Sequence, residues 1–154
     1  MVRLYNAYLQ PTFQYCSDVW HFCSARSREK LEQLNKQVLR IVLNDRTSSY
    51  LELLEKLNKK TLEQHRIDSM LTTVFKAIHG TAPAYLIDKL RPRQLAYNLR
   101  GHGKLLVPRV KTTKYGLQSF RYKAVWEWNR LSDSVRGAET LAAFRRGVQQ
   151  HVSL

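Results

Sequence analysis

Cysteine, acidic residues and long apolar runs are all scarce in this chain of 154 residues. Two cysteines cannot build a disulfide scaffold, and a chain of this length can bury roughly 68 to 70% of its unfolded surface without one. No run approaches the roughly 18 apolar residues that a membrane-spanning helix needs. Residues 1–13 also lack the apolar stretch of a signal peptide. We therefore expect an intracellular protein, nuclear or cytoplasmic, with no membrane partner.

Acidic residues are outnumbered by basic ones, 12 against 26, which gives a formal net charge of +14. Most of the excess lies in residues 91–130, where ten basic residues accompany one acid, Glu127. Such like charges repel one another, which destabilises the folded state. A polyanion that binds them relieves this repulsion and releases counterions, so its binding is favourable. A merely solubilising surface is the alternative, but such surfaces usually intersperse both signs. The segment therefore predicts a nucleic-acid partner held through its phosphates, with weak sequence preference.

Residues for catalysis or metal binding are also few. The chain has no Asp-Asp pair, and two-metal phosphoryl transfer needs converging carboxylates, so we expect no enzymatic activity. Cys16, His21 and Cys23 are of zinc-binding type, but their spacing does not match a closed four-ligand site. No metal or cofactor is expected, and both cysteines are predicted to be buried or half-buried.

Apolar residues at helical spacing predict a mainly α fold, a bundle-like helical domain with an irregular basic loop and at most a short edge strand pair. Apolar residues at helical spacing within 31–42, 50–57, 62–78, 117–131 and 141–152 predict one helix each, and 85–90 adds a further turn or two. The expected N-caps are Ser27, Ser48 or Ser49, and Thr140; the expected ends are Asn44 and Gly80. We expect three parts: a helical region 1–90, a basic loop 91–116 and a C-terminal helical pair 117–154.

Two helical faces are predicted to pack in a core. The first comprises Leu31, Leu34, Val38, Ile41 and Val42; the second comprises Leu117, Phe120, Ala124, Trp128 and Leu131. Between 91 and 116 the helical period disappears, and prolines and glycines favour a loop. A short extended piece around 105–110 contains Pro108, which limits it to an edge strand.

Aromatic residues beside cations complete the candidate interface. Trp20 and Trp128 lie on apolar faces and are interpreted as core residues. Trp126 lies on the opposite side of its helix with Tyr122 and Lys123, where an aromatic ring can stack on a base or pack on another helix. The predicted nucleic-acid-binding residues are Arg91, Arg93, Tyr97, Arg100, Lys104, Arg109, Lys111, Lys114, Tyr115, Lys123, Trp126 and Arg130.

Several spaced motifs together resemble the C-terminal part of reverse transcriptases, RNA-directed DNA polymerases, of non-LTR (LINE-type, jockey or CR1-like) retrotransposons. The N-terminal motifs are Leu4-Tyr5-Asn6, Pro11, Tyr15-Cys16-Ser17-Asp18-Val19-Trp20, Lys30-Leu31-Glu32-Gln33-Leu34 and Leu39-Arg40-Ile41-Val42. The later ones are His79-Gly80-Thr81-Ala82-Pro83-Ala84-Tyr85-Leu86, Tyr97-Asn98-Leu99-Arg100, Tyr115-Gly116, Ser119-Phe120-Arg121-Tyr122, Trp128-Asn129-Arg130-Leu131, Thr140-Leu141 and Phe144-Arg145. The chain departs from the family at Lys60-Thr61-Leu62, where Leu-Pro is common.

The resemblance implies a helical thumb and downstream segment that grips template RNA, an RNA–DNA hybrid or DNA beside the polymerase palm and fingers. It also implies a fragment, or a decayed or repurposed copy, without the catalytic Ala-Asp-Asp motif. Leu4, Tyr8 and Phe13 are then expected to form faces for the missing palm. A helical protein-interaction scaffold and a relic without independent activity are the alternatives; salt-dependent RNA binding separates the scaffold from the nucleic-acid binder.

Overall fold

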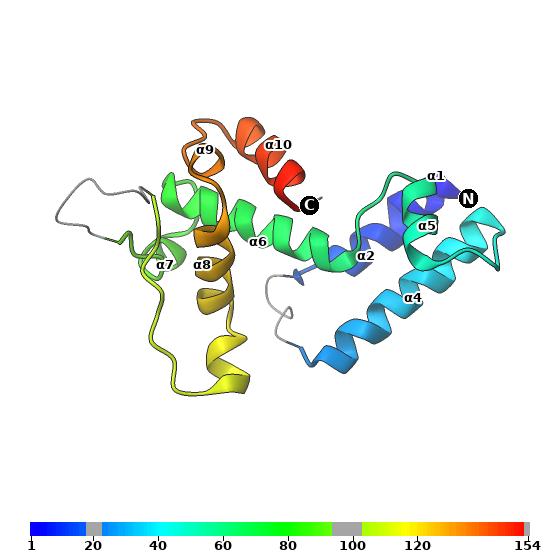
Figure 1. Ribbon diagram of the computed structural model, residues 1–154, viewed down its shortest axis with the longest axis horizontal. Coiled ribbons are helices and arrows are strands. Elements are labelled where there is room, and N and C mark those ends of the chain that lie inside the picture. The colour runs from blue at the N-terminus through cyan, green and yellow to red at the C-terminus, as the bar shows by residue number, and fades with distance from the viewer. Residues whose placement is uncertain (18–22, 94–102, 153–154) are drawn as a thin grey trace. The chain divides into compact units, whose positions relative to one another are not determined.

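A computed structural model gives the fold and describes residues 1–17, 23–93 and 103–152. The chain packs as two compact units, Met1–Arg66 and Ile67–Leu154. The described residues are mainly helical and contain no β-strand, only one isolated antiparallel bridge between Pro92 and Leu105 (Figure 1). The predicted fold class is therefore confirmed, whereas the three-part division at residues 90 and 116 stays a prediction.

The N-terminal unit is built from short helical turns and two longer helices. Its elements are α1 (Val2–Leu4), the π-helical turn η1 (Tyr5–Leu9), α2 (Gln10–Gln14), α4 (Ala25–Leu43) and α5 (Tyr50–Lys56). The N-cap of α4 is Ser24, whose hydroxyl accepts a hydrogen bond from the Ser27 amide, so the prediction of Ser27 as the cap was wrong. Asn44 ends α4 as predicted and has the left-handed conformation, and Ser49 starts α5 with a capping box.

The buried face of α4 differs from the predicted one. Leu34 and Ile41 are exposed, and the fully buried residues of the helix are Asn35 and Leu39. Tyr5 Oη donates to Asn35 Oδ1 at 2.8 Å, and Asn35 Nδ2 donates to Tyr50 Oη at 2.8 Å. A buried amide that can both accept and donate is satisfied by these two hydroxyls, so a polar residue occupies a core position.

Glu32 extends this hydrogen-bond chain. Its carboxylate accepts from Tyr50 Oη at 2.6 Å and from the backbone amides of Leu62 and Glu63 at 3.3 and 2.9 Å. These amides belong to the first turn of α6 (Leu62–Ile78), where unpaired donors and the helix dipole favour a carboxylate. Glu32 therefore fixes the start of α6 against α4.

The stability of the N-terminal unit is expected to fall above about pH 10 because of Tyr50. Burial and the hydrogen bond to Glu32 raise the pKa of Tyr50 above its ordinary value. Above about pH 10 the folded state therefore retains a Tyr50 proton that the unfolded state releases. The stabilisation that Tyr50 provides is fully present below about pH 10 and is lost as the pH rises toward the folded pKa. Urea unfolding across this range should show a shallower alkaline loss for Tyr50→Phe than for the wild type. The matched control is the exposed Tyr8→Phe, and equal alkaline slopes in all three proteins would contradict the assignment.

The C-terminal unit contains the remaining helices. After most of α6 come α7 (Ala84–Ile87), the π-helical turn η2 (Thr113–Leu117), α8 (Phe120–Arg130), α9 (Asp133–Arg136) and α10 (Leu141–Val152). Gly80 follows α6 with a φ of 69°, as a left-handed helix end requires. The Thr140 hydroxyl accepts from the Ala143 amide at 3.2 Å, which confirms the predicted cap of α10.

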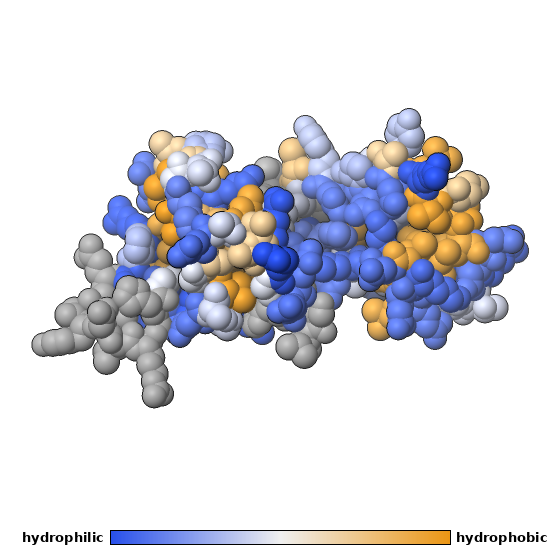
Figure 2. Space-filling model, turned by 90° about the horizontal axis from the view of Figure 1, so that it is seen from above, coloured by the Kyte–Doolittle hydropathy of each residue, from blue (hydrophilic) through white to orange (hydrophobic). Residues whose placement is uncertain are grey.

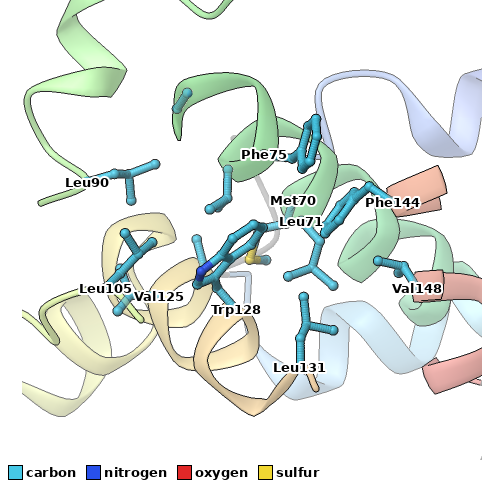
Figure 3. Packing of buried hydrophobic residues seen from close by; sticks show 13 residues of the cluster. Met70, Leu71, Phe75, Leu90, Leu105, Val125, Trp128, Leu131, Phe144 and Val148 are labelled. Atoms are coloured by element: carbon cyan, nitrogen blue, oxygen red, sulfur yellow. The ribbon is translucent and has the colours of Figure 1, made fainter. Parts of the chain in front are cut away.

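Trp128 lies at the centre of the C-terminal core, among side chains of α6, α8 and α10 (Figure 3). Its ring centroid is 5.5 Å from that of Phe144, which in turn stacks on Phe75 at 4.5 Å. The prediction of Trp128 as a core residue is thus confirmed, whereas Trp20 lies outside the described residues. Leu117, predicted to share this core, is exposed because it precedes the N-cap Ser119.

Candidate nucleic-acid interface

The isolated bridge brings two basic stretches together. The Arg93 amide donates to the Lys104 carbonyl oxygen at 2.9 Å, and the Leu106 amide donates to the Arg91 carbonyl oxygen at 2.9 Å. Arg91 and Arg93 are exposed and Lys104 is half-buried. The bridge therefore places three cations, Arg91, Arg93 and Lys104, on neighbouring backbone segments.

The last turn of α8 holds this bridge in place. Asn129 binds the backbone of Leu105 twice, because its Oδ1 accepts from the Leu105 amide and its Nδ2 donates to the Leu105 carbonyl oxygen, each at 2.9 Å. Trp128 Nε1 donates to the Gly103 carbonyl oxygen at 2.8 Å. Buried backbone groups that have no ladder partner need such partners, so Trp128 and Asn129 position the basic segment on the helix.

Arg136 fixes the end of α8. Its guanidinium is buried and donates to the carbonyl oxygens of Asn129 and Leu131 at 3.1 and 2.5 Å. It also pairs with the Asp133 carboxylate. A cation at the unpaired carbonyls of a helix C-terminus is favourable, and here it secures the turn that carries Asn129.

Residues 103–117 run along α8 in the opposite direction (Figure 1). Gly103 and Leu105 contact the last turn of the helix, and η2 leads into its first turn. At Gly116 a Cβ would lie 2.8 Å from Val110 Cβ, so glycine permits the chain to close there. The loop prediction holds for 103–112 but was wrong for 113–116, which form most of η2 because the Thr112 carbonyl oxygen accepts from both Gly116 and Leu117.

The predicted cations lie on this segment and on α8. Arg109, Lys111 and Arg130 are exposed, and Lys123 is half-buried. Among the described residues of the predicted set, only Arg130 forms an ion pair, with Glu127 at 3.7 Å within α8. The described cations of the segment are thus not neutralised by carboxylates from other elements. Tyr97 and Arg100 lie outside the described residues, as does the side chain of Lys114.

The aromatic members of the predicted set differ in their surroundings. Trp126 is 42% exposed, and the Arg130 guanidinium lies over its ring at 4.5 Å from the centroid. Tyr122, Lys123, Leu117 and Trp126 line a hollow of about 250 Å³. Tyr115, in η2, is 75% exposed. The structure thus brings Trp126 together with Lys123 and Arg130 as predicted.

Sequence reasoning missed the positioning residues Trp128, Asn129 and Arg136, although the first two lie in the Trp128-Asn129-Arg130-Leu131 motif. It also misplaced Cys16, which is exposed in the turn that follows α2, where its φ is 50°; Cys23 is half-buried. In the described parts of the chain no three His, Cys, Asp or Glu side chains gather as a metal site. None of the helices in the described residues combines the length and the apolar composition of a membrane span.

Comparison of the chain with protein-family models, with curated proteins and with solved structures finds no significant match.

Proposed function

We propose that the chain is a non-catalytic nucleic-acid-binding module that grips RNA or DNA through backbone phosphates. The observation that supports this most is the row of cations along α8, from Arg91, Arg93 and Lys104 at one end to Arg109 and Lys111 on the adjoining segment. The 11 residues of α8 span about 16 Å, and one strand of a nucleic-acid helix presents a phosphate about every 3.4 Å. A strand lying along α8 therefore offers about five phosphates to this row.

The resemblance to non-LTR retrotransposon reverse transcriptases suggests which strand is bound. In that setting the module grips template RNA, the RNA–DNA hybrid or the DNA copy, while the polymerase carboxylates lie outside this chain. Phosphates carry no sequence information, so sequence preference is expected to be weak.

A protein-interaction scaffold is the second candidate, and exposed apolar side chains of the N-terminal unit favour it. Leu4, Tyr8, Ile41 and Leu51 are all exposed, the first two as predicted for a face that packs on a partner; Phe13 is half-buried. Figure 2 shows a broad apolar area on this unit, at the end where α1 and α5 lie. Contiguous exposed apolar surface is typical of protein-binding sites.

Fluorescence anisotropy separates the two functions. Labelled single-stranded RNA, single-stranded DNA and an RNA–DNA hybrid are titrated with the full chain, and polyglutamate serves as a polyanion competitor without nucleotides. We expect binding of all three nucleic acids with little dependence on sequence and with weaker competition by polyglutamate. Absence of binding at low salt would contradict the proposed function and leave the scaffold as the better account.

A further inference from the structure

We infer that the hollow beside Trp126 receives one unpaired base, so that the module prefers single strands to duplexes. This inference rests on the proposed function and adds the structural class of its ligand. Four residues line the hollow: Leu117 of η2 and Tyr122, Lys123 and Trp126 of α8. Two aromatic rings, an aliphatic side chain and a cation are the groups that stack on a base and bind its phosphate.

The size of the hollow favours a single flat ring. Its volume of about 250 Å³ lies below the roughly 300 Å³ at which pockets for drug-sized ligands begin. A base within a duplex has both faces covered by its neighbours and cannot enter such a space, whereas a base of a single strand turns out of the stack at low cost.

The indole of Trp126 is held in an exposed position by a residue outside the hollow. Arg130 follows Trp126 by one helical turn and places its guanidinium over the ring, whereas the hollow's other lining residues precede Trp126. Side chains of a helix lean toward its N-terminus, so Arg130 leans onto Trp126, and Trp126 leans toward Tyr122 and Lys123. The ring is thus fixed on the side of Arg130 and open toward the hollow.

The hollow adjoins the backbone segment that carries part of the row of cations. Leu117 follows Gly116 directly, and Gly116 lies against Val110, which is flanked by the exposed Arg109 and Lys111. At the hollow itself, Lys123 forms no ion pair with a carboxylate of the described residues. A strand whose phosphates follow the row therefore passes close to the hollow, where Lys123 provides a further cation for the phosphate of the base that enters it.

The test compares strands with and without bases on two proteins. An oligonucleotide with bases and an abasic strand of equal length and charge are titrated with the wild type and with Trp126→Ala. Stacking on one aromatic ring is worth about 5- to 150-fold in affinity, so the wild type should prefer the base-containing strand by this factor, and Trp126→Ala should lose the preference. Trp126→Phe, which keeps an aromatic ring, should retain most of it. The matching duplex should bind the wild type more weakly than the single strand and bind both proteins equally.

The outcomes distinguish this inference from the proposed function. Salt-dependent binding in which the base-containing and abasic strands bind the wild type equally would overturn the inference and leave phosphate binding intact. An unchanged preference in Trp126→Ala would overturn it as well. Absence of nucleic-acid binding by the wild type, or selective binding of an acidic peptide instead, would overturn both.

Discussion

Replacing Arg91, Arg93 and Lys104 together by alanine is expected to reduce the salt dependence of nucleic-acid binding by more than half. Each phosphate contact contributes about −0.9 to the slope of log affinity against log salt on duplexes, and about −0.7 on single strands. Three lost contacts should thus make the slope shallower by about two to three. Anisotropy titrations at several salt concentrations measure this slope directly. The substitutions should preserve the bridge between Pro92 and Leu105, because the three replaced residues contribute only backbone atoms to it.

The matched control removes the same charge from the N-terminal unit. Arg26, Lys30 and Arg46 are exposed, and replacing them by alanine also lowers the net charge by three. If the charge of the molecule as a whole governed binding, both triple variants would change the slope equally, and the account of a local interface would be wrong. We expect the control slope to stay close to that of the wild type.

Replacing Trp128 by alanine is expected to destabilise the C-terminal unit by about 3 to 5 kcal/mol. The side chain is fully buried among α6, α8 and α10, and its loss leaves a cavity that the packed rings of Phe75 and Phe144 cannot fill (Figure 3). The Gly103 carbonyl oxygen also loses its donor. Because domains are stable by only about 5 to 15 kcal/mol, urea unfolding should detect this loss readily.

Trp126→Ala is the matched control for this substitution, since the residue type and the helix are the same. Trp126 is partly exposed and lies outside the core, so we expect a loss of less than about 1 kcal/mol. Equal destabilisation by the two substitutions would contradict the described packing of α8. The far-ultraviolet circular dichroism of Trp126→Ala should match that of the wild type.

Local signals in the sequence predicted much of the fold. The caps Ser49 and Thr140 and the helix ends Asn44 and Gly80 act on residues within a few positions, so they can be recognised without tertiary structure. Helical spacing alone also predicted that Trp128 faces the core and that Trp126 lies on the opposite side of the helix, because a shift of two residues turns a side chain to the opposite side.

Residues whose roles depend on distant partners could not be predicted in this way. Asn35 is buried because Tyr5, 30 positions earlier, and Tyr50 satisfy its amide. Asn129 positions the basic segment through Leu105, 24 positions earlier. A polar residue on a helix is ordinarily interpreted as exposed, and only the tertiary contacts show otherwise. The candidate site was therefore predicted by its charges and aromatics but not by the residues that hold it.

The salt dependence of strand binding by the wild-type chain tests the central claim most directly. If the basic segment along α8 binds about five phosphates, the logarithm of affinity should fall against that of salt with a slope of about −3.5 on single strands and about −4.5 on duplexes. Between 50 and 200 mM salt this corresponds to a loss of about 130-fold on single strands and about 500-fold on duplexes. A flat response over the same range would contradict the account, because a site that exchanges counterions for phosphates cannot be insensitive to salt.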